Sequence, residues 1–203
     1  MRASTRREFV AGPAGKIECA VDEPQGGVPR GLALVAHPHP LFGGTLGNKV
    51  VQTLARAFVE LGYAAWRPNF RGVGASEGSH HEGRGEVDDL IAVIGHVKSA
   101  RPVLAGFSFG AAVQSRVAKV LAKAGNPPSR MVLVGIAVGR GEVPPVPADT
   151  IVIHGEEDTT VPLVEVLAWA RPQDLPVTVV PGADHFFHRR LHILRAIVHN
   201  AWK

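Results

Sequence analysis

Several residue types are scarce in this sequence, and each scarcity excludes a class of protein. Cys19 is the single cysteine, so the chain can form neither an intramolecular disulfide nor a multi-thiolate metal site. No uncharged apolar stretch is long enough to span a bilayer, and no apolar run of signal-peptide length follows the basic N-terminal residues. We therefore expect a cytoplasmic protein without membrane contact, in which Cys19 is a small core residue.

Clustered positive charge is also missing. The formal net charge is +4 and the sequence pI is about 9.6, but the arginines are scattered and adjacent pairs occur only at residues 6–7 and 189–190. Nucleic-acid binding requires a clustered basic stripe. The charge therefore indicates an ordinary solvated surface and no nucleic-acid partner.

The bulk composition is that of one folded domain. Of the 203 residues, 45% are hydrophobic and 20% charged, and the 23 glycines and 16 prolines lie between apolar runs rather than in a tract. Disorder, collagen-like repeats and long coiled coils are excluded by this composition. We expect a single domain over residues 1–203.

Short apolar runs rich in Val, Leu, Ile and Ala alternate with longer amphipathic segments, a pattern typical of alternating strands and helices. Two runs around the turn at 12–15 predict an opening antiparallel hairpin over residues 8–11 and 16–21. The whole pattern predicts an α/β fold, with a mostly parallel sheet of about eight strands and helices on both faces. The other strands are expected at residues 32–37, 64–68, 103–107, 131–136, 151–154 and 177–180, and the helices at residues 48–61, 86–99, 110–124, 163–169 and 189–202.

Residues 103–112 place a G-x-S-x-G motif between an apolar strand and a helix start. A nucleophilic serine needs its hydroxyl exposed at a sharp turn, and Gly106 and Gly110 remove side chains where the strand and the helix approach each other. The helix N-terminus also favours the negative charge that develops during attack. Ser108 is therefore the candidate nucleophile. The competing interpretation is a serine that merely caps the helix.

Serine needs a base, and the base needs an orienting acid. Asp158 lies just past a predicted strand and His185 lies in a loop past the last strand, so both follow the serine in the required order. Glu156 and Glu157 are alternative acids, although we expect them to face solvent. Asp184 is a poor alternative because it directly precedes His185.

We expect most of the ten histidines to take no part in catalysis. His154 closes a strand and should form a hydrogen bond within its own loop. His80 and His81 lie in a polar loop, and His96 lies on a helix. Three others are expected at the surface in or beside the C-terminal helix: His188, His192 and His199.

Five segments occur in a characteristic order: residues 37–44 (HPHPLFGG), residues 69–78 (NFRGVGASEG), the motif around Ser108, residues 154–162 and residues 182–188. Together they resemble the α/β-hydrolase superfamily, specifically its small, lidless, dienelactone-hydrolase-like members of bacterial type. The resemblance implies the α/β-hydrolase fold, a Ser108–His185–Asp158 catalytic triad, and hydrolysis of an ester or related acyl bond. Serine stands where dienelactone hydrolases carry cysteine, so their substrate is not implied.

Attack on an acyl carbon leaves negative charge on the former carbonyl oxygen, and two backbone N–H groups usually bind it. One belongs to the residue after the nucleophile, Phe109, and the other to the loop after the first parallel strand. Pro38 and Pro40 have no N–H, which leaves His39 and Leu41 as donors. His39 is favoured because this segment resembles an H-G-x-P loop, in which the x residue is the donor.

Neither a metal nor a cofactor is expected. His37 and His39 make a poor metal site because the sequence places no third ligand nearby. Residues 69–78 are rich in glycine, but they lack lysine and the G-K-[ST] ending of a phosphate-binding loop. Arg71 is instead expected to form local salt bridges or hydrogen bonds.

The resulting hypothesis is a serine hydrolase that cleaves a carboxylic ester with a small or extended acyl group through an acyl-enzyme intermediate. The alternatives are a thioesterase, amidase or peptidase using the same triad, or a non-catalytic binding protein that retains the fold. We expect the substrate pocket to be lined by residues 39–45, Phe107, Phe109 and residues 137–150. This last segment, where relatives insert a lid, has only 14 residues, so we predict an open site without a cap domain.

Overall fold

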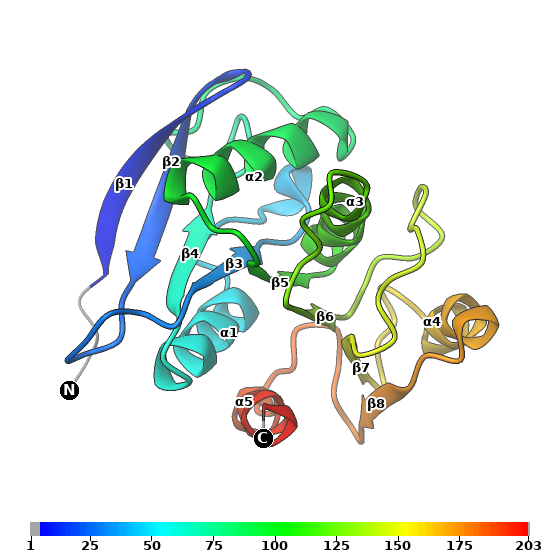
Figure 1. Cartoon of the computed structure of the whole chain (residues 1–203). Helices are drawn as coiled ribbons and strands as arrows, with labels where there is room; N and C mark the ends of the chain where they lie inside the picture. The colour runs from blue at the N-terminus through cyan, green and yellow to red at the C-terminus, as the bar shows by residue number, and fades with distance from the viewer. Residues whose placement is uncertain (1–4, 203) are drawn as a thin grey trace.

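Eight strands form one sheet in the computed structural model, which describes residues 5–202 (Figure 1). The order across the sheet is β1-β2-β4-β3-β5-β6-β7-β8. β1 and β2 form a hairpin and β2 is antiparallel to β4, whereas all other neighbours are parallel. The predicted mostly parallel α/β sheet is therefore confirmed. The strands are β1 (Arg6–Gly12), β2 (Gly15–Asp22), β3 (Leu32–Ala36), β4 (Ala64–Pro68), β5 (Val103–Phe107), β6 (Arg130–Val134), β7 (Ile151–Gly155) and β8 (Val177–Val180).

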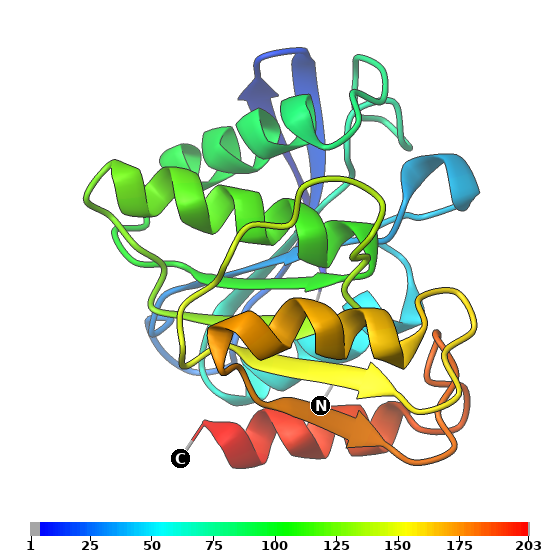
Figure 2. The ribbon, with the colours of Figure 1, turned by 90° about the vertical axis from the view of Figure 1, so that its right-hand side faces the viewer.

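Helices cover both faces of the sheet, as predicted (Figures 1 and 2). Successive residues of a strand point to opposite faces. Leu32 and Leu34 of β3 therefore pack on the side of α2, α3 and α4, whereas Ala33 and Val35 pack on the side of α1 and α5. The helices are α1 (Lys49–Glu60), α2 (Arg84–Val97), α3 (Phe109–Lys123), α4 (Leu163–Ala170) and α5 (Leu191–Ala201), with short 3₁₀ helices η1 (Pro40–Phe42) and η2 (Arg171–Gln173).

Three of the element boundaries that differ from prediction have local reasons. Helix α2 begins before residue 86 because the Glu86 carboxylate accepts a hydrogen bond from the Gly83 N–H and so stabilises an earlier first turn. The same helix ends before Lys98, which adopts a left-handed conformation with φ 55°. Strand β6 is shorter than predicted because Gly135, with φ 51°, turns the chain out of the sheet.

The loops that follow the parallel strands gather at one edge of the sheet, the edge at which open α/β sheets bind ligands. The segment between β6 and β7 reaches the same edge. Residues 135–150 contain no helix and no strand. This connection therefore contains no cap domain, and the edge of the sheet is left open.

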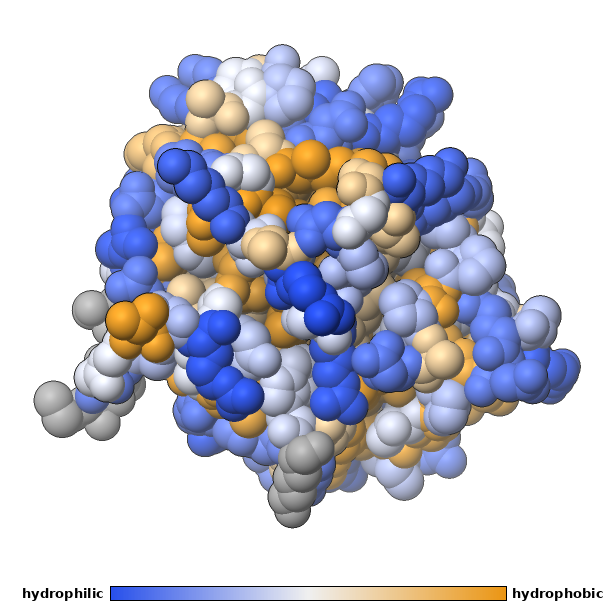
Figure 3. Space-filling model, viewed as in Figure 1, coloured by the Kyte–Doolittle hydropathy of each residue, from blue (hydrophilic) through white to orange (hydrophobic). Residues whose placement is uncertain are grey.

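The single cysteine lies in the interior, as the sequence predicted. Cys19 is fully buried in β2, where burial, and then the neighbouring Glu18, raise the pKa of its thiol to about 12. Among residues 5–202 no helix is both long and apolar enough to cross a bilayer. On the face shown in Figure 3, hydrophilic residues are interspersed with smaller apolar patches.

The packing of β5 against α3 predicts opposite effects for two Gly→Ala substitutions. A Cβ at Gly106 would lie 2.5 Å from the carbonyl carbon of Gly110, whereas a Cβ at Gly95, on the exposed side of α2, would meet nothing within 4 Å. We expect Gly106→Ala to destabilise the protein by about 1–3 kcal/mol and Gly95→Ala to stabilise it by about 0.5–1 kcal/mol. Urea unfolding of both variants measures this, and a Gly106→Ala protein as stable as wild type would refute the proposed close packing.

Candidate active site

Ser108 lies at the turn between β5 and α3, with φ 54° and ψ −118°. A non-glycine residue in this region costs roughly 1–3 kcal/mol and persists only where the surroundings impose it. Here Gly110 packs so closely on the end of β3 that a Cβ would lie 2.4 Å from the His37 carbonyl oxygen. The Ser108 side chain makes no capping hydrogen bond to α3. Ser108 occupies the N-cap position of α3, but its side chain does not cap the helix.

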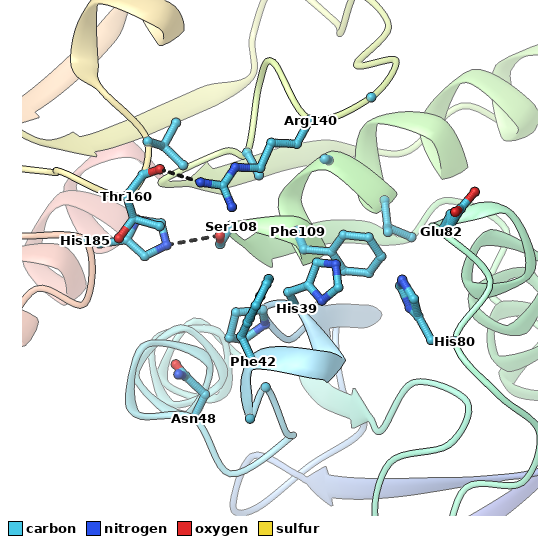
Figure 4. Close-up of a pocket in the computed structure, with 18 of the residues that line it drawn as sticks. His39, Phe42, Asn48, His80, Glu82, Ser108, Phe109, Arg140, Thr160 and His185 are labelled. Carbon is cyan, nitrogen blue, oxygen red and sulfur yellow. Dashed lines mark hydrogen bonds between the residues drawn. The ribbon is translucent and has the colours of Figure 1, made fainter.

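A chain of two hydrogen bonds joins Ser108, His185 and Asp158. Figure 4 shows the first of them, between Ser108 and His185. His185 Nε2 lies 3.0 Å from Ser108 Oγ, and His185 Nδ1 lies 2.6 Å from Asp158 Oδ2. A carboxylate oxygen can only accept, so Nδ1 carries the ring hydrogen and Nε2 is free to accept from the serine hydroxyl. All three residues are buried. The three residues selected from the sequence thus meet, although Asp158 and His185 lie far from Ser108 in the chain.

Asp158 is held by its own loop. Its Oδ1 accepts hydrogen bonds from the N–H groups of Thr160 (2.9 Å) and Val161 (2.8 Å). Burial alone would raise the pKa of this carboxyl, but the hydrogen bonds from His185 and Val161 and the nearby His154 outweigh burial and lower it. Asp158 is therefore the ionised acceptor that His185 needs.

The other acidic candidates lie elsewhere. Glu156 and Glu157 are exposed, as predicted, and Glu156 accepts a hydrogen bond from the Gly182 N–H. Asp184 pairs with His188, with 2.6 Å between Oδ2 and Nδ1. Glu156 and Asp184 therefore have other partners, and Glu157 is exposed.

His154 closes the turn that carries Asp158, as the sequence predicted. Its Nε2 lies 2.9 Å from the carbonyl oxygen of Val161 and 3.4 Å from Asp158 Oδ2. Burial lowers the pKa of this imidazole, so it is the neutral ring whose Nε2–H donates to Val161. Val161 is then bound through both its N–H and its carbonyl group, which fixes the turn.

Phe107 supports His185 from below and does not line the cavity, so its predicted role as a lining residue is wrong. Its side chain is fully buried, and its ring centroid lies 4.8 Å from that of His185. Side chains alternate along β5, which places Phe107 on the α1 and α5 side of the sheet. Phe186, which packs edge-on against His185, lines the cavity.

In the loop after β3, the backbone N–H groups of His39 and Leu41 differ in whether they already donate a hydrogen bond. The Leu41 N–H donates to Nδ1 of His39 (3.3 Å) at the start of η1. Among the described residues, no hydrogen bond has the His39 N–H as its donor. Of the two candidates left by the prolines, His39 therefore has the unengaged N–H.

His37 links this loop to the next one. Its Nδ1–H donates to the Pro38 carbonyl oxygen (2.6 Å), and its Nε2 accepts from the Phe70 N–H (2.9 Å). Burial lowers the pKa of His37 to about 4, so the ring is neutral. Both ring nitrogens are engaged, which leaves none to bind a metal. Within residues 5–202 no three His, Cys, Asp or Glu side chains gather in a way that could hold one.

Arg71, in the glycine-rich segment after β4, makes local contacts as predicted. Its guanidinium binds both carboxylate oxygens of Asp89, each at 2.8 Å, and also donates to the Gly85 carbonyl oxygen. These bonds tie the segment to α2. They leave the guanidinium engaged in the interior rather than facing a ligand.

A cavity of about 620 Å³ opens beside Ser108 and His185. Its predicted lining is present in part, through Phe109 and residues of the 39–45 and 137–150 segments. A face of α3 also lines the cavity, and it was not predicted: Ala112, Val113 and Arg116 follow Phe109 at helical spacing. Lining side chains from the other loops were missed as well: Asn48, His80, Glu82, Thr160, Val161 and Phe186.

Comparison with known proteins settles the family. A model described as the alpha/beta hydrolase family matches residues 34–144, more than half of the chain. The chain belongs to the α/β hydrolase family. It is 31% identical over 199 residues to the uncharacterized protein RP471 of Rickettsia prowazekii, a match that covers 88% of this chain and 81% of the relative.

Solved structures of other family members share the fold closely. XC6422 from Xanthomonas campestris, an α/β serine hydrolase without a lid, has a TM-score of 0.87 at 36% identity, covering 99% of this chain and 94% of its own. An α/β serine hydrolase homologue from Coxiella burnetii has a TM-score of 0.83 at 34% identity over the full length of both chains. This protein is accordingly a homologue of lidless α/β serine hydrolases.

A more distant structure shares the fold alone. Est1E from Butyrivibrio proteoclasticus, solved with ferulic acid bound, has a TM-score of 0.79 at 15% identity, covering 95% of this chain and 96% of its own.

The buried, neutral His37 predicts a loss of stability in mild acid. Its pKa is about 4 in the fold against 6.5 ordinarily, so folding disfavours protonation. Above pH 6.5 the ring is neutral in both the folded and the unfolded chain, so it costs no stability. As the pH falls from 6.5 towards 4, the unfolded chain is protonated first, and the free energy of unfolding falls by about 3 kcal/mol in total. We expect wild type to lose more unfolding free energy between pH 7 and pH 4 than His37→Gln, which has no titrating ring. Equal losses in urea titrations of the two proteins would contradict this.

Proposed function

We propose that this protein is a serine hydrolase that cleaves carboxylic esters through an acyl-enzyme intermediate. The observation that carries the proposal is the hydrogen-bonded chain from Ser108 through His185 to Asp158, which ends at an open cavity. A strained serine, an imidazole within hydrogen-bond distance of it and a buried carboxylate are the parts that nucleophilic acyl transfer requires.

In the first half of the reaction Ser108 Oγ attacks the acyl carbon while His185 Nε2 takes the hydroxyl proton. Asp158 stabilises the resulting imidazolium through the bond to Nδ1. Collapse of the tetrahedral intermediate breaks the bond to the alcohol oxygen, which leaves with the proton from Nε2. In the second half water attacks the acyl-serine by the same route, which releases the acid and regenerates Ser108.

Two backbone N–H groups would bind the oxyanion. Phe109 is the first residue of α3, where the helix dipole adds positive potential. His39 supplies the second because its N–H is not otherwise engaged, whereas the Leu41 N–H is bonded to the His39 ring. Such donors act on charge that develops only during the reaction, so they raise kcat more than they lower KM.

An uncapped cavity suits small soluble or extended esters. Its volume of about 620 Å³ is within the range of small-molecule pockets. The ferulic acid bound to Est1E is a ligand of this size class held in the same fold. With no cap domain between β6 and β7, we expect no surge in activity when a triglyceride passes its solubility limit.

The proposal predicts that activity depends on Ser108 alone among the buried serines of this region. Ser108→Ala should lower kcat/KM for 4-nitrophenyl butyrate by at least about 1,000-fold, because no other group can form the acyl-enzyme. Ser115→Ala is the matched control, since its hydroxyl is buried on α3 and bonded to the Ala112 carbonyl oxygen. A fluorophosphonate should label wild type and Ser115→Ala but not Ser108→Ala. Unchanged esterase activity in Ser108→Ala would end the proposal.

A second prediction concerns the His39 N–H. His39 has φ −56°, which proline also adopts, so His39→Pro removes the donor without forcing a new backbone angle. We expect kcat to fall about 100- to 1,000-fold with a small change in KM. His39→Ala loses the same side chain but keeps the N–H, and should retain most of the activity. If His39→Pro were as active as His39→Ala, the donor would have to be Leu41.

A further inference from the structure

Two arginines line the cavity without a carboxylate partner. Arg140 lies on the loop between β6 and β7, and Arg116 lies on α3. Elsewhere in the described chain, Arg67 and Arg71 bind the carboxylates of Asp22 and Asp89. Neither cavity arginine makes such an ion pair within residues 5–202. Neither guanidinium group of the cavity is therefore bonded directly to a carboxylate in the described part of the chain.

Backbone carbonyl groups hold both side chains in place. Arg140 Nη2 donates to the Thr160 carbonyl oxygen (3.1 Å), and Arg116 donates to the carbonyl oxygens of Glu142 (2.9 Å) and Glu82 (3.1 Å). A carbonyl group positions a guanidinium without cancelling its charge. Arg140 uses one of its five N–H groups for the hydrogen bond to Thr160, so its remaining donors are available to a ligand.

Three acidic side chains near the cavity have other partners. Glu82 is the one acidic residue among those lining it, and its carboxylate is exposed and lies 3.3 Å from Arg84. The carboxylate of Glu142 pairs with Lys119 at 2.8 Å. Asp158 lies behind His185 and accepts its ring hydrogen. None of these carboxylates is left to bind Arg140.

Arg140 is on the reactive side of the cavity. Figure 4 shows its side chain extending over Ser108 towards Thr160 and His185, whereas His80 and Glu82 lie beyond Phe109 at the opposite end. Thr160 is also in the turn that binds Asp158, so the arginine is anchored to the same loop as the hydrogen-bonded chain. A negative group held there would belong to the substrate molecule being cleaved.

We propose, on the basis of the ester hydrolysis proposed above, that the cavity selects esters that carry a carboxylate group, bound by Arg140 with support from the charge of Arg116. The planar guanidinium matches a carboxylate in shape as well as charge. The substrate class is therefore a half-ester of a dicarboxylic acid, or an ester whose alcohol part carries the carboxylate.

Two pairs of substrates test this, each differing only in a free or a methylated carboxyl group. One pair is mono-4-nitrophenyl adipate and its methyl ester, with the carboxylate on the acyl side. The other is 4-carboxyphenyl butyrate and its methyl ester, with the carboxylate on the leaving group. In wild type we expect kcat/KM for the free carboxylate of at least one pair to exceed that of its methyl ester by about 10- to 100-fold, mainly through KM.

Arg140→Gln should abolish this preference, bringing the ratio close to one, and added salt should weaken it in wild type. Arg56→Gln is the control, because Arg56 is exposed on α1 away from the cavity and its loss removes the same charge from the whole protein. Its ratio should equal that of wild type. Thermal unfolding of Arg140→Gln checks that the exposed loop substitution leaves the fold intact.

Two results would overturn the inference and leave the esterase proposal standing. One is rapid cleavage of the methyl esters by wild type with no preference for the free carboxylate in either pair. The other is a preference that survives in Arg140→Gln. Failure of the esterase proposal has a different signature: no substrate is cleaved and fluorophosphonate does not label Ser108, in which case the carboxylate selection falls with it.

Discussion

Three backbone segments meet at Ser108, and the close approach of those segments is the constraint on which the site depends. The end of β3, the end of β5 and the start of α3 come so near one another that neither Gly106 nor Gly110 has room for a Cβ. Ser108 is held between them in a conformation that costs roughly 1–3 kcal/mol. The buried packing of β5 and α3 on either side supplies the stability that keeps the residue there.

The remaining groups are positioned by loops that leave the same edge of the sheet. Asp158 is fixed by two N–H groups of its own turn, and His154 closes that turn from beneath. Phe107 supports the imidazole of His185 while remaining outside the cavity. On the other side, the neutral His37 joins the loops after β3 and β4. For Asp158, geometry and charge have a common origin, because the hydrogen bonds from His185 and Val161 that hold the carboxylate also lower its pKa.

The sequence predicted which side chains meet where a candidate residue follows a regular element. Ser108, Asp158 and His185 each come just after a strand, and parallel strands bring their carboxyl ends to one edge. The position of Phe107 could also have been inferred by counting alternation along β5, which places it with Val103 and Ala105 on the opposite face.

Other parts of the site could not be inferred in this way. His80 and Glu82 lie in an irregular loop whose path depends on the Glu86 and Arg71 contacts of α2, and no periodic pattern encodes such a path. Arg116 lay on a recognisable helical face beginning at Phe109, so a signal existed. What the sequence could not show is that its partners are carbonyl groups rather than carboxylates. That distinction depends on contacts between segments far apart in the chain, and it determines the charge of the cavity.

The central claim is that Ser108 becomes acylated during turnover, and mass spectrometry of the intact protein tests it most directly. Wild type mixed with 4-nitrophenyl butyrate and quenched in acid early in the reaction should gain the mass of one butyryl group, and proteolysis should place that group on the peptide containing Ser108. The account predicts that the adduct forms and then disappears as the substrate is exhausted. Turnover without any adduct, or an adduct on a different residue, would contradict it.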